Sequence, residues 1–262
     1  MPNFSNITVV AIHGNNGIEK EIFALEKTAE GLPGCRTLLI TNKAVESPIP
    51  QKYVWQELDY FGYSEFVIYC LHNYIETDYV LIVQSDGWML NAENWRDEWY
   101  NYDYIGGWTH AAFDGDIFYK WYEYMNCEHP VRVVQNGGFS LRSKKFLEAP
   151  SKYGIVRHAK SNAELNNEDI QLCCFMRPAL EKVGMKFAPE SESKLFSFEH
   201  LHPILHQDID LKKIFGHHSR FRRLLDDNVM EWRLSPEEQN NIVWEDRVYE
   251  LFRSYGYKMW QC

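Results

Sequence analysis

Short apolar runs alternate with amphipathic stretches along the first third of the chain. Aliphatic and β-branched residues fill 7–12, 36–41 and 79–86, a composition typical of strands that are buried on both faces. Apolar residues recur with helical periodicity in 19–32 and 63–75. The order strand, helix, strand, helix, strand predicts an α/β fold in which crossover helices flank a mainly parallel central sheet.

The regular alternation fades after this third strand. Residues 94–116 are rich in aromatic residues and contain glycines, which favours an excursion that lines a substrate site over another βα unit. The stretch 131–149 predicts a strand, a Gly-Gly turn, a second strand and a helix. A helix is also predicted over 166–184, with acidic residues in its first turn and a kink or split at Pro178.

The remaining sequence predicts a single domain. Short strands are expected at 185–189 and 193–200, followed by mostly helical structure. The chain of 262 residues has no internal repeat and no low-complexity linker. We therefore expect one main domain over 1–225, with a helical extension over 226–262 packed on it.

Composition narrows the classes of function. The sequence has no run of about 18 apolar residues, and its amino-terminal stretch lacks the features of a secretory signal, so the cytoplasm is the expected compartment. The six cysteines include no C-x-x-C pair, which favours reduced thiols. A net charge of -10 argues against broad binding to nucleic acid, because such binding needs a basic surface.

The ends of the three strands are the first place to look for a ligand. In open α/β sheets, ligands bind outside the carboxyl ends of the strands. These ends are Ile12-His13-Gly14-Asn15, Thr41-Asn42 and Gln84-Ser85-Asp86. Asp86 suits Mn²⁺ or Mg²⁺, which prefer oxygen ligands and often link carboxylates to phosphates. The structural alternative is a simple turn, because Ser-Asp-Gly is ordinary turn chemistry.

A second group of residues joins a glycine pair to two carboxylates. The motif NGGFSLR begins at Asn136 and contains Gly137 and Gly138, which let the backbone approach a ligand closely. Glu168 and Asp169 follow at a predicted helix start, where a carboxylate is able to act as a general base toward a sugar hydroxyl. A hairpin turn and an acidic first helical turn are the structural alternative.

A third group is basic. The motif FGHHSRFRR contains His217 and His218 next to Arg220, and such a group suits a diphosphate. The alternative is a solvated helix start. The Arg-Phe-Arg-Arg run is also a candidate for peripheral contact with an anionic membrane.

Two rival metal motifs are present. A literal Asp-x-Asp occurs at 114–116, but it follows an aromatic stretch and favours a turn or an acceptor-side loop. Three histidines in 199–206 raise the alternative of a metallohydrolase, although no further ligands of recognised spacing accompany them.

Six motifs in order carry a resemblance to a known class. They are YVLIVQSDGWML, YDYIGG, NGGFSLRS, NNEDIQLC, KLFSFEH and FGHH. Over about residues 7 to 221 the chain resembles poorly characterised bacterial glycosyltransferase-like proteins of the GT-A type. The resemblance implies a single GT-A-like, Rossmann-like catalytic domain that uses a nucleotide-sugar donor.

The resemblance also implies roles for individual residues. Asp86 matches the carboxylate that holds a divalent metal, but Gln84 stands where the common Asp-x-Asp motif has its first acid, which leaves metal dependence open. Asp169 matches the base that deprotonates the acceptor, with Glu168 beside it, and His218 or His217 completes the metal or diphosphate site. The implied donor contacts are Ile12, His13, Thr41, Gln84, Ser85, Asp86, Asn136, Gly137, Gly138 and Arg220.

The expected function is transfer of a hexosyl or related group to a glycan or lipid-linked acceptor during surface polysaccharide assembly. Inversion follows if Asp169 acts as a base, and retention follows if it attacks the anomeric carbon. Trp88, Trp108 and Phe113 are the expected acceptor-lining rings. A non-catalytic module that binds nucleotide sugars or carbohydrates is the alternative from another class.

Overall fold

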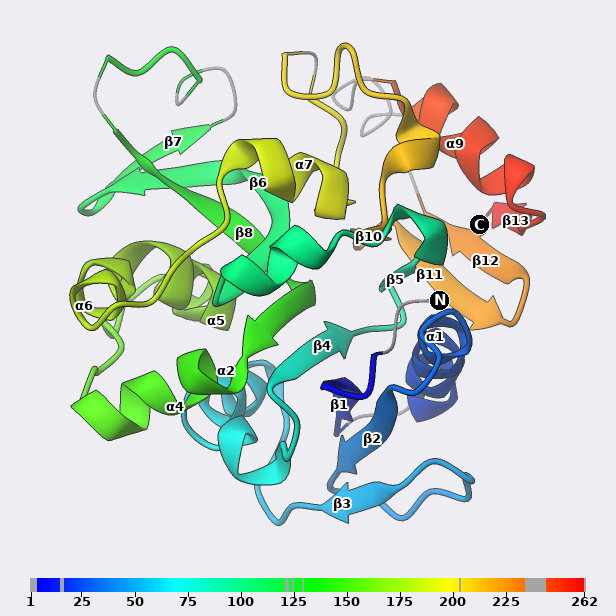
Figure 1. Cartoon of the computed structure of the whole chain (residues 1–262), viewed down its shortest axis with the longest axis horizontal. Helices are drawn as coiled ribbons and strands as arrows, with labels where there is room; N and C mark the ends of the chain where they lie inside the picture. The colour runs from blue at the N-terminus through cyan, green and yellow to red at the C-terminus, as the bar shows by residue number, and fades with distance from the viewer. Residues whose placement is uncertain are drawn as a thin grey trace.

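A mixed seven-stranded sheet forms the centre of the molecule (Figure 1). The computed structural model describes residues 4–14, 17–120, 123, 125–128, 130–202, 204–233 and 244–261. The strand order is β3–β2–β1–β4–β8–β6–β7. The strands are β1 (Ile7–His13), β2 (Arg36–Thr41), β3 (Gln51–Tyr53), β4 (Tyr79–Val83), β6 (Tyr104–Asp114), β7 (Ile117–Lys120) and β8 (Arg132–Ser143). The α/β class predicted from the sequence is confirmed.

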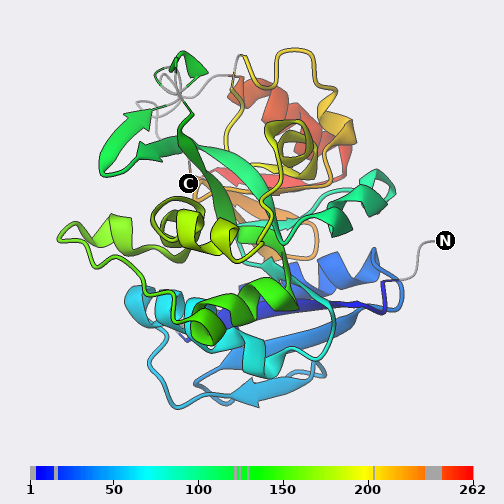
Figure 2. The same ribbon diagram turned by 60° about the vertical axis from the view of Figure 1, so that its left-hand side comes forward.

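The two halves of the sheet differ in direction. The strands β3, β2, β1 and β4 are parallel, as their alternation with helices predicts. The pairs β4–β8, β8–β6 and β6–β7 are antiparallel. The sheet is therefore mixed, and only its first half has the parallel arrangement that the sequence predicts. Figure 2 shows the β6–β7 hairpin projecting at the far end of the sheet from β3.

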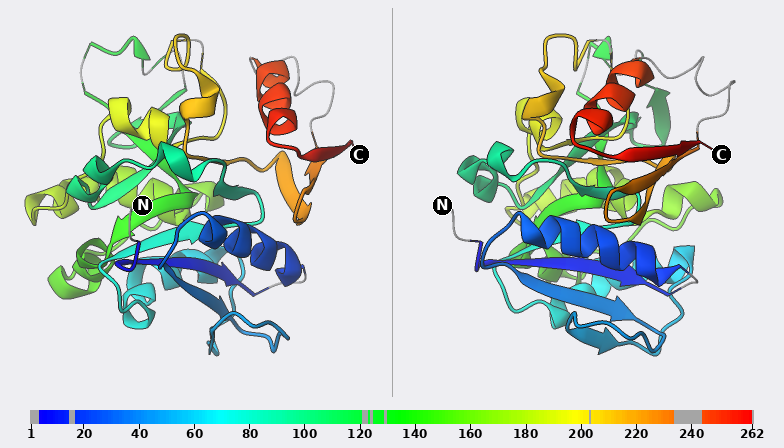
Figure 3. Two further views of the ribbon diagram at one scale, coloured as in Figure 1. Left: turned by 45° about the vertical axis from the view of Figure 1, so that its right-hand side comes forward. Right: turned by 90° about the vertical axis from the view of Figure 1, so that its right-hand side faces the viewer.

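Helices cover both faces of the parallel half. Because side chains alternate along a strand, Val9 of β1 packs in one cluster with α1 (Ile18–Glu30), and Val10 packs in another with α2 (Tyr60–Tyr69) and α4 (Lys144–Tyr153). The predicted first helix ends at Gly31, as expected. In the right-hand view of Figure 3 the strands β1 and β2 end on the same side of the molecule.

The prediction of a Gly-Gly turn within 131–149 is wrong. The strand β8 runs without a break through Gly137 and Gly138. A Cβ at Gly137 would lie 2.0 Å from Glu168 Oε1, and one at Gly138 would lie 2.3 Å from His218 Nε2. The glycines are needed because side chains from other elements press against this strand. They are not needed to reverse the chain.

Residues 94–116 do not form an excursion over a substrate site. They contain the short helices η2 (Ala92–Asn94) and η3 (Asp97–Asn101), followed by the long strand β6. The turn between β6 and β7 carries Gly115 at φ 58°, so the literal Asp-x-Asp motif is a hairpin turn.

The helix predicted over 166–184 is divided, as the proline suggests. It consists of α5 (Glu168–Ile170), the π-helical turn η5 (Gln171–Phe175) and α6 (Arg177–Lys182), which begins next to Pro178. The segment 193–200 is only partly a strand, because α7 (Glu190–Phe196) ends inside it before β9 (Ser197–Phe198). At 185–189 the only pairing among the described residues is an isolated bridge between Phe187 and Tyr104.

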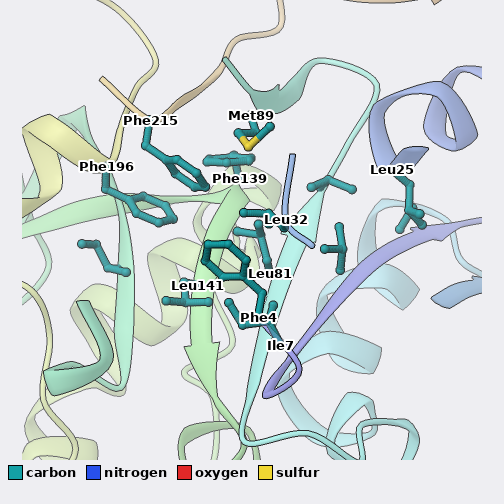
Figure 4. Packing of buried hydrophobic residues seen from close by; sticks show 14 of the residues in the cluster. Phe4, Ile7, Leu25, Leu32, Leu81, Met89, Phe139, Leu141, Phe196 and Phe215 are labelled. Carbon is teal, nitrogen blue, oxygen red and sulfur yellow. The ribbon is translucent and has the colours of Figure 1, made fainter. Parts of the chain in front are cut away.

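A ring cluster joins β8 to the start of another small sheet. That sheet has the order β5–β10–β9 and includes β5 (Gly87–Met89) and β10 (Gly216–His218). The ring centroid of Phe139 in β8 lies 5.4 Å from that of Phe196 and 5.7 Å from that of Phe215. Figure 4 shows these three rings and Met89. Phe215 immediately precedes β10, so this packing brings His218 to the central sheet.

The described residues of the carboxyl-terminal extension include strands as well as a helix. It contains α9 (Glu245–Ser254), and it also forms a sheet of β11 (Arg222–Asp226), β12 (Val229–Trp232) and β13 (Lys258–Gln261). Figure 3 shows this unit beside α1. Trp88, Trp232 and Phe252 share one apolar cluster, so the extension is packed on the main domain through a common core.

The bounds of the other short helices complete the description: η1 is Leu71–Tyr74, η4 is Ala163–Asn166 and η6 is Leu211–Lys213. Within the described ranges, no helix is both long and apolar enough to cross a membrane.

Candidate active site at the carboxyl ends of the strands

A cavity of about 360 Å³ lies where the parallel strands end. It collects residues that are far apart in the sequence, from β1, α1, α2, the turn after β4, β8, α5 and β10. The predicted site residues among its lining are Ile12, His13, Gln84, Asn136, Gly138, Glu168, Asp169 and His218. The tertiary structure thus brings together the three groups of candidate residues that the sequence contains.

A tight turn places Asp86 at this edge. The backbone N–H of Gln84 donates to the carbonyl of Gly87 at 2.9 Å, and the N–H of Gly87 donates back at 2.8 Å. The strand therefore ends at Val83, earlier than the predicted residue 86, and the chain reverses into β5. Asp86 is at the tip of the turn, and its Oδ1 lies 3.3 Å from Nε2 of His218.

The side chain of Asn136 determines where His218 carries its proton. The Oδ1 atom of Asn136 accepts the backbone N–H groups of Gly138 and Phe139 at 2.8 and 3.3 Å. Its amide nitrogen therefore faces His218 Nδ1, at 2.7 Å. Because an amide nitrogen only donates, Nδ1 is the acceptor.

In the neutral form of His218 the proton is therefore at Nε2. This atom lies 3.1 Å from Oε1 of Gln84, in addition to its contact with Asp86. Burial opposes a charge on the imidazole, but the pairing with Asp86 prevails and raises the pKa of His218 to about 9. Burial likewise favours a neutral Asp86, and His218 more than offsets it, so the pKa of Asp86 is lowered.

The hydrogen bonds of His218 differ from those of a typical metal-binding histidine. A histidine that binds a metal through Nε2 needs a free lone pair there and usually donates its Nδ1–H to an acceptor. In His218, Nδ1 faces the amide nitrogen of Asn136, and Nε2 faces Asp86 and Gln84. Gln84 also supplies an amide in place of a second carboxylate. Within the described part of the chain, no group of three or more His, Cys, Asp or Glu residues is arranged to hold a metal ion.

His217 is not placed to take part in a metal site. It is fully buried, and its ring contacts Trp88 at 4.1 Å and Phe252 at 4.8 Å between centroids. Burial drives the pKa of His217 well below its ordinary value, so the ring is a neutral part of the core. Successive residues of a strand point to opposite faces, which explains why only His218 reaches the cavity.

The carboxylates after Asn167 have different surroundings. Glu168 is buried, and its Oε1 accepts a hydrogen bond from Nη2 of Arg142 at 2.7 Å. Arg142 is fully buried and also donates to the carbonyl of Gly137 at 3.3 Å. Glu168 is thus held by an ion pair. Asp169, the next residue, is the predicted base.

Asp169 faces the cavity with little charge compensation. Its oxygens accept the backbone N–H groups of Ile170 at 2.8 Å and Gly137 at 3.3 Å. Burial, followed by repulsion from Glu168, raises the pKa of Asp169 to about 7. A carboxyl group with a pKa near neutrality is well matched to proton transfer.

Glu21 is a site residue that the motifs do not reveal. This α1 residue lines the cavity, accepts the N–H of Ser85 at 2.7 Å and lies 3.5 Å from Nδ1 of His13. Burial, and then the charge of Asp86, raises the pKa of Glu21 to about 7. The available signal was an acid on the apolar stripe of α1, one turn from Ile18 and Leu25.

Several predicted contacts lie elsewhere. Thr41 is buried at the end of β2 and accepts the N–H of Lys43, and Arg220 is exposed against the ring of Phe221. Ser85 and Gly137 support the cavity through backbone contacts to Glu21 and Asp169.

The three expected acceptor rings are not at the cavity. Trp88 and Phe113 are buried in separate apolar clusters, and Trp108 packs beside a small cluster at the β6–β8 pair. Trp88 and Phe113 therefore contribute to the core, and Trp108 is partly buried on β6.

The basic run is also largely structural. Arg222 is fully buried and donates to Glu245 at 2.6 Å, so it is not part of a basic face for a membrane. In the histidine-rich segment, His202 Nδ1 accepts the backbone N–H groups of Ile204 and Leu205. His206 Nδ1 accepts the N–H of His202. These bonds favour a local structural role over the metallohydrolase alternative.

Comparison with known proteins identifies the family. Residues 59–218 match the model of a family described as protein of unknown function, DUF5672, and they make up more than half of the chain. This chain belongs to the DUF5672 family. The matched segment begins at the N-cap of α2 and ends at His218, so it contains Gln84, Asp86, Asn136 and Asp169.

We also compared the chain with curated protein sequences and with solved structures. No curated protein sequence matches this DUF5672 chain. Among solved structures, the chain is similar to the galactosyltransferase LgtC, whose crystal structure is a complex with donor and acceptor sugar analogues. The alignment covers 94% of this chain and 95% of the other, with 12% sequence identity and a TM-score of 0.46. A likeness at this level carries no argument about fold or activity.

The hydrogen-bond polarity around His218 predicts that the DUF5672 chain alone does not bind Mn²⁺ at this site. Titration followed by the electron paramagnetic resonance signal of free Mn²⁺ should show no saturable binding below millimolar concentration, and Asp86→Asn should give the same curve. A tight site in the wild type that Asp86→Asn abolishes would contradict the prediction.

The buried ion pair predicts that removing only one of its two partners strongly lowers the stability of the fold. Arg142→Met leaves Glu168 as a buried carboxylate without its partner, and should lower the free energy of unfolding by about 3–5 kcal/mol. Urea denaturation measures this change. As a control, Arg253→Met removes an exposed pair with Glu250 and should cost less than about 1 kcal/mol. The double variant Arg142→Met/Glu168→Gln should recover part of the loss, and no recovery would contradict the pairing argument.

Proposed function

We propose that this DUF5672 protein is a GT-A-type glycosyltransferase, which moves a sugar from a nucleotide-diphosphate donor to a hydroxyl group of a glycan or lipid-linked acceptor. The observation that carries the proposal is the position of Asp169. Its carboxyl group lines a cavity at the carboxyl ends of parallel strands, and its pKa of about 7 fits a general base. The order of the six sequence motifs supports the same class.

The proposed reaction is a single displacement. The acceptor hydroxyl gives its proton to Asp169 as its oxygen attacks the anomeric carbon. The bond from this carbon to the diphosphate oxygen breaks, and the electron pair leaves with the nucleoside diphosphate. In-line attack by an external oxygen inverts the anomeric configuration, in keeping with Asp169 as a base.

Residues at the strand ends are placed to bind the donor nucleotide and the leaving diphosphate. Ile12 and His13 lie at the end of β1, where we place the nucleobase and ribose. His13 and His218 line the cavity, where we place the leaving diphosphate next to their ring nitrogens. In our proposal these protein groups stabilise the leaving diphosphate without a metal step.

The proposed setting is assembly of a surface polysaccharide in the cytoplasm. This setting rests on the motif resemblance, and the acceptor then presents a sugar hydroxyl to Asp169. A protein that only binds nucleotide sugars is the competing function, since the amide of Gln84 replaces an expected acid.

Donor binding is the first prediction. A screen of nucleotide-diphosphate sugars with different bases should find at least one that raises the melting temperature. A ligand at 100 times its Kd stabilises the folded state by about 2.7 kcal/mol. The shift should be the same in EDTA and in Mn²⁺. No shift with any nucleotide sugar would count against the function, whereas a shift only with Mn²⁺ would contradict metal independence alone.

Loss of the base should abolish turnover and preserve donor binding. Asp169→Asn should reduce donor consumption in the presence of acceptor by about 100-fold or more, with an unchanged donor-induced thermal shift. Asp116→Asn, in the β6–β7 turn, is the matched control and should leave both quantities unchanged. Donor binding without turnover in the wild type on any acceptor would favour the binding protein.

The raised pKa of Asp169 sets the expected pH dependence. The base acts as a carboxylate, so kcat/KM should fall as pH drops through about 7 and Asp169 gains its proton. An ordinary aspartate with a pKa of about 4 would keep kcat/KM constant in this range. Glu21→Gln removes the other carboxyl group with a pKa of about 7, and should leave the midpoint in place. A midpoint that moves with Glu21→Gln would assign the titration to Glu21.

A further inference from the structure

Four aromatic side chains are exposed within nine residues, from the end of β3 to the first turn of α2. The exposed fractions are 53% for Tyr53, 92% for Trp55, 60% for Tyr60 and 49% for Phe61. We call these four residues the aromatic strip. Large rings in solvent contribute little to the core, and several of them close together are typical of a binding surface.

The backbone under the aromatic strip is firmly anchored. Val54 and Leu58 are each 4% exposed and pack in the cluster beneath α2. The N–H of Val54 donates to the carbonyl of Thr41 at 2.9 Å, and the carboxylate of Asp59 caps α2 by accepting the N–H of Gly62 at 2.7 Å. The segment therefore presents its rings from a fixed backbone, which lowers the entropy cost of binding.

The aromatic strip continues the wall of the candidate active site. In the sheet, Thr41 pairs with His13 on one side and with Tyr53 on the other, so all three lie at the same edge. His13 lines the cavity, and Tyr60 at the other end of the strip lines it too.

Tyr60 connects the strip to the proposed base. Tyr60, Asn167 and Asp169 line the same cavity, and Asn167 precedes Asp169 by two residues. A ligand that extends from Asp169 past Tyr60 would therefore meet the rest of the strip.

Local charge distinguishes between two kinds of partner for exposed rings. Residues 51–61 contain one basic residue, Lys52, and two acids, Glu57 and Asp59, which gives a net charge of -1. Attachment to an anionic membrane requires a cluster of basic residues beside the apolar groups. Binding of an uncharged sugar does not require basic residues, because the apolar faces of sugar rings stack on tyrosine and tryptophan while their hydroxyls stay in water.

We propose that the aromatic strip is the acceptor subsite, where a glycan chain stacks on Trp55 and Tyr53 while its terminal sugar passes Tyr60 toward Asp169. This assignment rests on the proposed transferase function. It replaces Trp88, Trp108 and Phe113 as the rings that contact the acceptor. The class of ligand is an uncharged oligosaccharide of several residues, since the rings extend from the cavity along the end of the sheet.

The test compares two exposed tryptophans. The protein, saturated with the nucleotide sugar found in the thermal-shift screen, is applied to an array of neutral oligosaccharides, and affinities for the bound glycans are then measured by titration. Trp55→Ala should weaken glycan binding by about tenfold, as loss of a central aromatic contact does. Trp260→Ala removes a ring that is 60% exposed on β13 and should change nothing.

Each other outcome overturns the assignment. Equal glycan affinity in Trp55→Ala and wild type, or no glycan bound by the wild type, would show that the strip is not the acceptor subsite. Loss of binding to phosphatidylglycerol vesicles in Trp55→Ala, without loss of glycan binding, would assign the strip to a membrane. Dissociation of a dimer in Trp55→Ala would assign it to a second copy of the chain.

The same variants separate this inference from the function on which it rests. Because Trp55 does not line the cavity, Trp55→Ala should keep the donor-induced thermal shift of the wild type. If the wild type shows a donor shift and Trp55→Ala keeps its glycan affinity, only the acceptor assignment fails. If no nucleotide sugar shifts the wild type, the transferase function itself fails.

Discussion

The buried ion pair between Arg142 and Glu168 is the constraint on which the candidate site depends. Two charges out of water are tolerated only with close pairing and further hydrogen bonds. Arg142 meets this requirement by contacting both Glu168 and the carbonyl of Gly137, which fixes α5 against β8. Asp169 follows Glu168 directly, so the ion pair also fixes the position of the proposed base in the cavity wall.

A second constraint acts through the direction of hydrogen bonds. Asn136 uses its oxygen on the backbone of its own strand, which leaves only its amide nitrogen for His218. The proton of His218 consequently lies between Asp86 and Gln84. The cluster thereby neutralises the carboxylate of Asp86 with a protein N–H group, at the position where the motif resemblance implied a metal ion.

The cavity and the aromatic strip lie at the same edge of the sheet. Parallel strands all end at one edge, so the groups after β1, β2, β3 and β4 gather there without any sequence proximity. A site built in this way has room for the donor at the middle of the sheet. The acceptor, in our proposal, extends toward β3 at the sheet edge.

The sequence by itself determined the elements whose pattern is local. Buried parallel strands and an amphipathic helix each have a characteristic period, and for this reason β1, α1 and β2 were predicted close to their observed bounds. The position of strand ends also made His13 and Gln84 candidates, and the acidic start of a predicted helix made Asp169 one. Their meeting in one cavity is now a structural observation, and their roles remain predictions.

Only the tertiary structure decided which face each residue presents and which partner it meets. His217 and His218 are adjacent in sequence, yet one is in the core and the other at the cavity. Gly137 and Gly138 resemble a turn, but they are strand residues that give space to Glu168 and His218. Such roles depend on side chains brought from distant parts of the chain, and no local pattern records them.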